Sequence, residues 1–227
     1  MASLLQKPVC EAVNAILNGK DHIRVLEAGC GSASQINFAP LVHAVGIDIE
    51  AGELEKNAAV QEKILGDIQD YPLPKEDFDV VVCWMVLEHL SRPKDALTNL
   101  FRTVKPGGIV ILGFPNLASI KGLVTKFTPF WFHKLFYRLM RYKSRHFPTY
   151  LRAAILPKRL IRFARDNGFS PAFYQLAEGG VAKKLRSRSS LADLGFSGID
   201  RTARLVSFGS WQSALLDECA VILKKSA

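Results

Sequence analysis

The sequence predicts an α/β fold with a doubly wound, mostly parallel sheet of the seven-strand type. Short apolar runs alternate with helix-prone segments along the first half of the chain, and the connections between them are short. The run 78–84 is apolar almost throughout, which is typical of a strand buried on both faces of a parallel sheet. Glycines and acidic residues follow the first strands, at the sheet edge where such folds bind ligands.

Helices and strands are expected where the apolar spacing matches 3.6 residues per turn or where short apolar runs are bounded by turn residues. We expect helices over residues 3–18, 51–63, 93–104 and 157–166. We expect strands over residues 22–27, 44–48, 64–67, 78–84, 108–114, 169–176 and 218–224. Residues 182–215 are ambiguous between helix and loop, and residues 34–41 make a poor helix that Pro40 would stop.

Length and composition indicate one globular domain over residues 1–227. Hydrophobic residues make up 48% of the chain and charged residues 22%, which excludes wholesale disorder, collagen and coiled coil. The longest apolar run, Val80–Leu87, is far shorter than the roughly 20 residues that a membrane-spanning helix needs. The N-terminus lacks a signal-peptide pattern and the four cysteines are scattered, so we expect a cytoplasmic protein with reduced thiols.

The charge is divided unevenly between the two halves of the chain. Residues 1–115 carry 10 basic and 15 acidic residues, whereas residues 116–227 carry 20 basic and six acidic residues. Nine of the 22 aromatic residues fall within 116–150. Basic and aromatic residues together are compatible with nucleic acid, an anionic membrane surface, or an acidic or apolar substrate, and also with a solvated cap around a small local core.

Three strand ends carry side chains that suit a nucleoside. Gly29 and Gly31 follow the first strand, where glycine permits a tight turn and a close approach to a ligand. Asp48 ends the second strand, where an acid accepts hydrogen bonds from ribose hydroxyls. Asp67 follows the third strand, from which it would reach an exocyclic amine of a purine.

The glycine turn differs from that of a dinucleotide-binding fold. The pattern is Gly29-x-Gly31-x-Ala33, without the third glycine, and no good helix follows to hold a pyrophosphate at its N-terminus. Glu27, just before the turn, would repel phosphates but would suit a cation. A nucleoside that carries an amine or a sulfonium therefore fits better than one that carries phosphates.

The sequence resembles the class I S-adenosylmethionine-dependent methyltransferases over residues 20–116. The matching stretches are VLEAGCGSAS at 25–34, VGIDIE at 45–50, LGDIQDYPLPKEDFDVVVCWMVLEHL at 65–90 and FRTVKPGGIVILGFPN at 101–116. The resemblance implies a Rossmann-like methyltransferase fold and S-adenosyl-L-methionine as the cofactor. The residues that it implies for cofactor binding are Glu27, Gly29, Cys30, Gly31 and Ser32 for the methionine part, Asp48 and Ile49 for the ribose, Asp67 and Ile68 for the adenine, and Cys83 and Trp84 beside the donor.

The phrase Leu87-Glu88-His89 after the fourth strand resembles that of the quinone-biosynthesis O-methyltransferases. Some of those enzymes add an acid three residues before the glutamate and bind a divalent ion, but Met85 stands there in this chain, so we expect no metal. Candidate catalytic bases are His89, which the motif places near the transferred methyl group, and His133 and Tyr137. Each of these is also compatible with a purely structural role.

The segment 116–155 is expected to be a cap inserted after the fifth strand, where this family elaborates substrate recognition. Its basic, aromatic stretch would either cover an apolar substrate or contact an anionic membrane through residues 127–145. We expect a methyltransferase that acts on an oxygen or nitrogen atom of a small aromatic or lipidic acceptor. The sequence indicates nothing about oligomeric state.

Two other classes of function remain open. An RNA or protein methyltransferase could dock through the basic half of the chain, although the fourth strand is followed by Cys83-Trp84-Met85-Val86 and not by an Asn-Pro-Pro-Tyr type motif, which disfavours nucleic acid. A non-catalytic module could retain the cofactor pocket without turnover.

Overall fold

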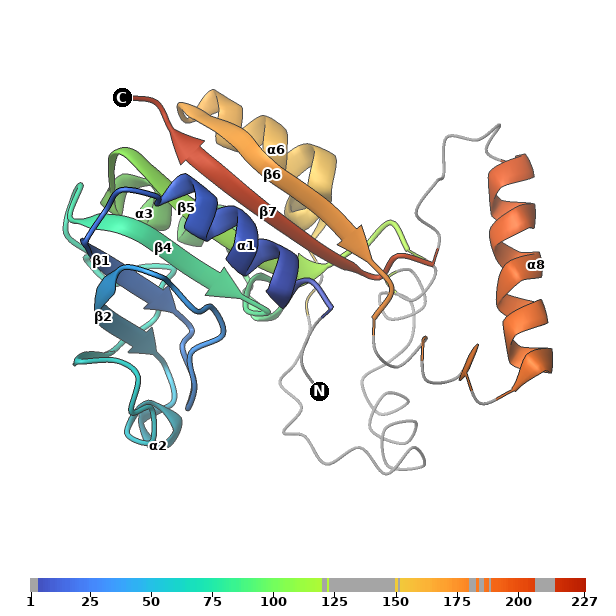
Figure 1. The fold of residues 1–227 in the computed structure, drawn as a ribbon, viewed down its shortest axis with the longest axis horizontal. Helices are drawn as coiled ribbons and strands as arrows, with labels where there is room; N and C mark the ends of the chain where they lie inside the picture. Colours follow the sequence, from blue (N-terminus) through green and yellow to red (C-terminus); the bar gives the residue numbers. More distant parts are fainter. Residues whose placement is uncertain are drawn as a thin grey trace.

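The structure is a computed structural model. It describes residues 4–119, 122, 150, 152–179, 183, 186–187, 189–206 and 215–227. Its centre is a seven-stranded sheet with the order β3-β2-β1-β4-β5-β7-β6 (Figure 1). The strands are β1 (His22–Ala28), β2 (Leu41–Asp48), β3 (Glu62–Leu65), β4 (Phe78–Trp84), β5 (Val104–Pro115), β6 (Phe169–Ala177) and β7 (Glu218–Lys225).

The expected fold class is confirmed. Strands β1 to β5 pair in parallel, whereas β7 runs antiparallel to both β5 and β6. The central strands are apolar over nearly their whole length because both faces of the sheet are covered. Because β1, β2, β3 and β4 run parallel, their carboxyl ends meet at one edge of the sheet.

Helices cover the two faces of the sheet (Figure 1). On one face, α1 (Gln6–Ile16) buries Val9 and Val13 against one apolar cluster. On the other face, α3 (Pro93–Thr103) and α6 (Pro157–Asp166) pack against a second cluster. Two short 3-10 helices, η1 (Leu87–His89) and η2 (Ala153–Ile155), complete this side, and α8 (Ser190–Val206) stands beside the sheet.

The helix expected over 51–63 is wrong for most of its length. Only α2 (Ala51–Leu54) is helical, and the chain then turns at Asn57, which is fully buried. The Asn57 side chain donates to the carbonyl oxygens of Cys30 at 3.3 Å and Gly31 at 3.2 Å, and its amide oxygen accepts the Ala59 N–H at 3.0 Å. These tertiary hydrogen bonds outweigh the helical preference of the segment and tie it to the glycine turn.

The connection between β1 and β2 contains no helix, whereas the sequence predicted a short, poor one over residues 34–41. The other strand and helix positions agree with the sequence to within a few residues. The largest shift is at β5, which begins at Val104 and therefore includes the Lys105–Gly108 turn that was expected to precede it.

Candidate active site

Two adjoining cavities, of about 450 Å³ and about 360 Å³, open at the carboxyl edge of the sheet. The first lies beside the ends of β1 and β4, and the second beside the end of β2 and the loop after β3. Gly29, Gly31, Ser32 and Met85 line both cavities, so the two form one divided cleft. A divided cleft of this kind suits an elongated ligand with two chemically different ends.

The glycine turn after β1 forms the floor of the cleft. Gly29 and Gly31 have positive φ angles of 69° and 51°, in the region that favours glycine. A Cβ atom at Gly29 would lie 2.4 Å from Cγ2 of Val86, whereas at Gly31 it would meet no atom within 4 Å. Packing against Val86 therefore requires glycine at position 29. At position 31, a side chain would enter space that a ligand can use.

Asp48 at the end of β2 fixes the turn. One oxygen of its carboxylate accepts the Gly31 N–H at 2.8 Å and the other accepts the Glu50 N–H at 2.9 Å. The carboxylate remains half-buried and lines the second cavity, so it retains acceptor capacity toward a ligand. The neighbouring Ile49 side chain is 63% exposed and gives the cavity an apolar wall.

Asp67 and Ile68 line the second cavity together with Asp48. The backbone N–H of Gln69 donates to the Asp67 carboxylate at 2.8 Å, and the Gln69 side-chain amide donates to both of its oxygens. Ile68 is buried at the cavity wall. An apolar wall beside a fixed carboxylate suits a flat ring with an amino group, as expected for adenine.

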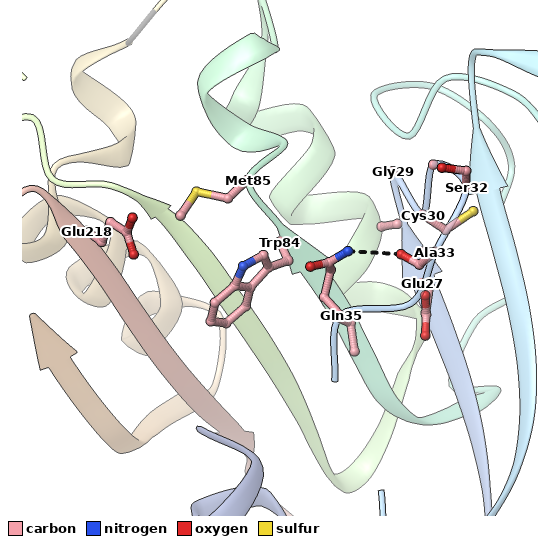
Figure 2. A pocket seen from close by; sticks show the side chains of 12 residues that line it. Glu27, Gly29, Cys30, Ser32, Ala33, Gln35, Trp84, Met85 and Glu218 are labelled. Atoms are coloured by element: carbon pink, nitrogen blue, oxygen red, sulfur yellow. Dashed lines mark hydrogen bonds between the residues drawn. The ribbon is translucent and has the colours of Figure 1, made fainter. Parts of the chain in front are cut away.

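The first cavity holds Glu27, whose side chain is 6% exposed. Burial raises the pKa of this carboxyl above its ordinary value. Figure 2 shows Gln35 between Trp84 and Glu27, with Met85 and Glu218 toward the other end. A cationic group bound here would stabilise the ionised form of Glu27 and gain an ion pair.

Among the aspartate, glutamate, lysine and arginine side chains, only acidic ones line the described part of the cleft. Within the described residues, no lysine or arginine lines either cavity. The six acidic residues are Glu27, Asp48, Glu50, Glu53, Asp67 and Glu218. This set favours a positively charged ligand and opposes a phosphate, so the residues fit S-adenosylmethionine, which carries a sulfonium and an ammonium group.

The structure brings most of the residues expected to bind the cofactor to this cleft. Those that line it are Glu27, Gly29, Cys30, Gly31, Ser32, Asp48, Ile49, Asp67, Ile68 and Trp84. Cys83 lines neither cavity, because its side chain is fully buried in the apolar cluster on the α3 side of the sheet. Strand alternation sends Cys83 to one face and Trp84 to the other.

Of the three residues expected to act as catalytic bases, the structure describes His89 alone. His89 lines the second cavity. His133, Tyr137, the membrane segment 127–145 and most of the expected cap over 116–155 lie outside the described residues. Sequence reasoning missed several residues that complete the cleft, namely Asn57 behind the glycine turn and the lining residues Gln35, Glu50, Glu53, Gln69, Met85 and Glu218.

Glu88, in the 3-10 helix η1 after β4, carries a buried carboxyl group. Its side chain points into the core, where Oε2 has no hydrogen-bond partner within the described part of the chain. Burial raises the pKa of this carboxyl from 4.5 to about 8. Oε1 of Glu88 lies 3.9 Å from Nε2 of His89, and no group of three metal-binding side chains occurs among the described residues.

We expect Glu88→Gln to remove a pH dependence of stability. Because the folded pKa of about 8 lies above the ordinary value of 4.5, the folded protein binds an extra proton between these two values. The free energy of unfolding of the wild type should therefore fall as pH rises through this window, by up to about 1.4 kcal/mol per pH unit. Glutamine cannot ionise, so the variant should gain stability relative to the wild type toward pH 8. Urea unfolding at several pH values measures this, with the exposed Glu55→Gln as control, and parallel curves for the wild type and Glu88→Gln would contradict it.

Comparisons with known proteins find similarity to methyltransferases in the first half of the chain. Residues 26–112 match the family described as "Methyltransferase domain". A probable S-adenosylmethionine-dependent methyltransferase of Mycolicibacterium smegmatis is 30% identical over 112 residues, which cover 47% of this chain and 44% of that protein. The mitochondrial ubiquinone biosynthesis O-methyltransferase of Schizosaccharomyces pombe is 32% identical over 114 residues, which cover 45% of this chain and 41% of that protein.

The fold is shared with solved structures. A structure of a S-adenosylmethionine-dependent methyltransferase from Archaeoglobus fulgidus superposes with a TM-score of 0.54 at 16% identity, over 98% of this chain and 93% of that one. The comparisons therefore relate residues 26–112 to the methyltransferase domain that the resemblance implied, and the solved structure shares the fold. The chain spans less than half the length of the curated relatives described above.

Proposed function

We propose that this chain is an S-adenosylmethionine-dependent methyltransferase that acts on an oxygen or nitrogen atom of a small acceptor. The observation that carries the proposal is the divided cleft, which has a glycine floor, an acidic lining and no lysine or arginine among its described residues. Such a cleft attracts a cationic donor and disfavours the phosphorylated cofactors that bind at the same edge of related sheets.

Each part of the cleft has a role in holding the donor. Glu27, whose side chain is buried in the wall of the first cavity, would hold the ammonium group of the methionine part. Asp48 would accept hydrogen bonds from the ribose hydroxyls. Ile49 and Ile68 would flank the adenine, and Asp67 would accept a hydrogen bond from its amino group.

When bound, S-adenosylmethionine supplies an electrophilic methyl carbon on a positively charged sulfur. The chain contributes orientation, because an in-line displacement needs the acceptor atom held opposite the leaving sulfur. His89 lines the second cavity and is our candidate to accept the proton of an acceptor hydroxyl or amine. Gln35 and Trp84 narrow the first cavity and would limit water there.

The proposed acceptor is aromatic or lipidic and carries an anionic group. In support, residues 116–150 hold nine of the 22 aromatic residues, and residues 116–165 hold 12 basic residues and no acidic one. The S. pombe relative, an O-methyltransferase of ubiquinone biosynthesis, supports the same class of acceptor. The same basic half of the chain favours a second candidate, a methyltransferase of RNA or protein that docks through it.

The test is transfer of a labelled methyl group from S-adenosylmethionine to fractionated cell extract. We expect label in low-molecular-weight, solvent-extractable material, at a rate that His89→Gln lowers by about a hundredfold while the affinity for the donor is kept. Label that is sensitive to ribonuclease or protease would favour the second candidate. Donor binding without transfer to any fraction would indicate a non-catalytic binding module.

A further inference from the structure

Helix α8 exposes a set of large apolar side chains to solvent. Leu191 is 82% exposed, Leu194 69%, Ile199 48% and Leu205 72%. Spacings of three and 14 residues place the three leucines on one face of the helix. Gly198, seven residues after Leu191, falls on the same face, and no atom lies within 4 Å of the point where its Cβ would be. No element of the described part of the chain packs on this outward face.

The polar face of α8 points the opposite way, toward the rest of the chain. Asp193 accepts a hydrogen bond from Nε of Arg186 at 2.7 Å. Arg186 also donates to the Glu178 carboxylate at 3.1 Å, and Glu178 follows the end of β6. Ser197, Asp200 and Arg201 of α8 line a cleft of about 530 Å³ together with Glu178 and Arg186.

The orientation is the reverse of that in an ordinary surface helix. A surface helix of a globular protein turns its apolar stripe to the core and its polar face to water. In α8, the partly buried ion pairs of Arg186 hold the polar face inward, so the leucines remain outside. In Figure 1 the helix stands apart from the sheet, on the side toward which β4 points and beyond the start of β7.

Charge indicates what this face contacts. The acidic side chains of α8, Asp193 and Asp200, face the inner cleft or its ion pair, which leaves no carboxylate among the exposed apolar residues. Residues 116–227, which include α8, carry 20 basic and six acidic residues. Lys183, which is exposed, lies shortly before the helix. Residues 181–206 carry six basic and two acidic residues. An apolar helix face in a basic stretch of chain complements an anionic lipid bilayer, in which leucines enter the interface and cations meet the headgroups.

We propose that α8 docks the protein on an anionic bilayer surface through Leu191, Leu194 and Leu205. The contact is peripheral, since no described helix is long and apolar enough to cross a membrane. The proposal does not depend on methyl transfer, and it concerns a different segment from residues 127–145.

Flotation with vesicles tests the proposal. The wild type and a Leu191→Gln/Leu194→Gln/Leu205→Gln variant are mixed with vesicles of phosphatidylcholine alone or with about one third phosphatidylglycerol. Glutamine retains helix propensity, so α8 should stay helical, which circular dichroism checks. The matched control is Leu4→Gln/Leu41→Gln/Leu65→Gln, which removes three leucines that are 47%, 68% and 59% exposed elsewhere on the molecule.

We expect the wild type and the control to float with the anionic vesicles and not with the neutral ones, and the α8 variant to partition at least tenfold more weakly. Equal flotation of the wild type and the α8 variant would overturn the proposal, and so would failure of the wild type to float. Sedimentation without lipid tests the other occupant of this face. A wild-type dimer that the α8 variant loses, together with no flotation, would assign the face to a second copy of the chain.

Discussion

Replacing Asp48 with alanine is expected to weaken binding of S-adenosylmethionine about a hundredfold. The carboxylate lines the second cavity and is our ribose acceptor, and it also holds the backbone N–H groups of Gly31 and Glu50 at 2.8 Å and 2.9 Å. A hydrogen bond to a charged group contributes about 1.5–3 kcal/mol. Losing the bonds from the two ribose hydroxyls should therefore cost about 3 kcal/mol or more of binding free energy. Titration calorimetry measures the loss.

The matched control for Asp48 is Asp70→Ala. Asp70 is exposed, forms an ion pair with Arg92 at 2.9 Å, and does not line either cavity. The control should bind the donor as the wild type does. An affinity of Asp48→Ala within about threefold of the control would contradict the role that we give to this carboxylate.

Substitutions of the two glycines of the turn should affect different properties: cofactor affinity at Gly31 and folding stability at Gly29. Gly31→Ala places a methyl group where no atom lies within 4 Å, inside the space shared by both cavities. We expect the variant to fold, with a loss of about 1–2 kcal/mol because alanine disfavours the φ of 51°. Its affinity for S-adenosylmethionine should fall at least tenfold. A variant of Gly31 that binds the donor normally would place the ligand elsewhere.

Gly29→Ala should act on folding first. Its Cβ would lie 2.4 Å and 2.9 Å from the two Cγ atoms of Val86, in addition to the strain of a φ of 69°. We expect a loss of about 3 kcal/mol or more in the free energy of unfolding. Adding Val86→Ala removes both Cγ atoms, so the double variant should recover part of the loss beyond additivity. Purely additive losses in denaturant unfolding would show that the clash is relieved by backbone movement instead.

The sheet could be predicted because its strands are short apolar runs that end in turn residues. The ligand edge followed from the same pattern, since the residues after parallel strands gather at one edge. This is why Asp48 and Asp67, which are distant in the sequence, could be assigned to one site. The glycines were recognisable by their spacing alone.

The orientation of residues within β4 could not be predicted. The run Val80–Trp84 is apolar at every position, and such a run does not say which side chains face α1 and which face α3. The structure places Val81 and Cys83 in one cluster and Val82 and Trp84 in the other. Cys83 is therefore in the core, and its neighbour Trp84 reaches the first cavity.

Tertiary contacts decide the remaining parts of the site. Asn57 interrupts an expected helix because its buried side chain holds the backbone of Cys30 and Gly31. Glu218, at the start of β7, reaches the first cavity because β7 inserts between β5 and β6. The sequence around Asn57 and the sequence around Glu218 give no sign of a ligand site. Each residue acquires its role from a segment more than 25 positions away.

Calorimetric titration of the wild-type chain with S-adenosylhomocysteine, beside NAD and ADP, tests the central claim most directly. An acid-lined cleft with a glycine floor predicts micromolar binding of the nucleoside that carries an ammonium group, and no measurable binding of the two phosphate-bearing ligands. Tighter binding of NAD or ADP, or no binding of S-adenosylhomocysteine by the folded protein, would contradict it.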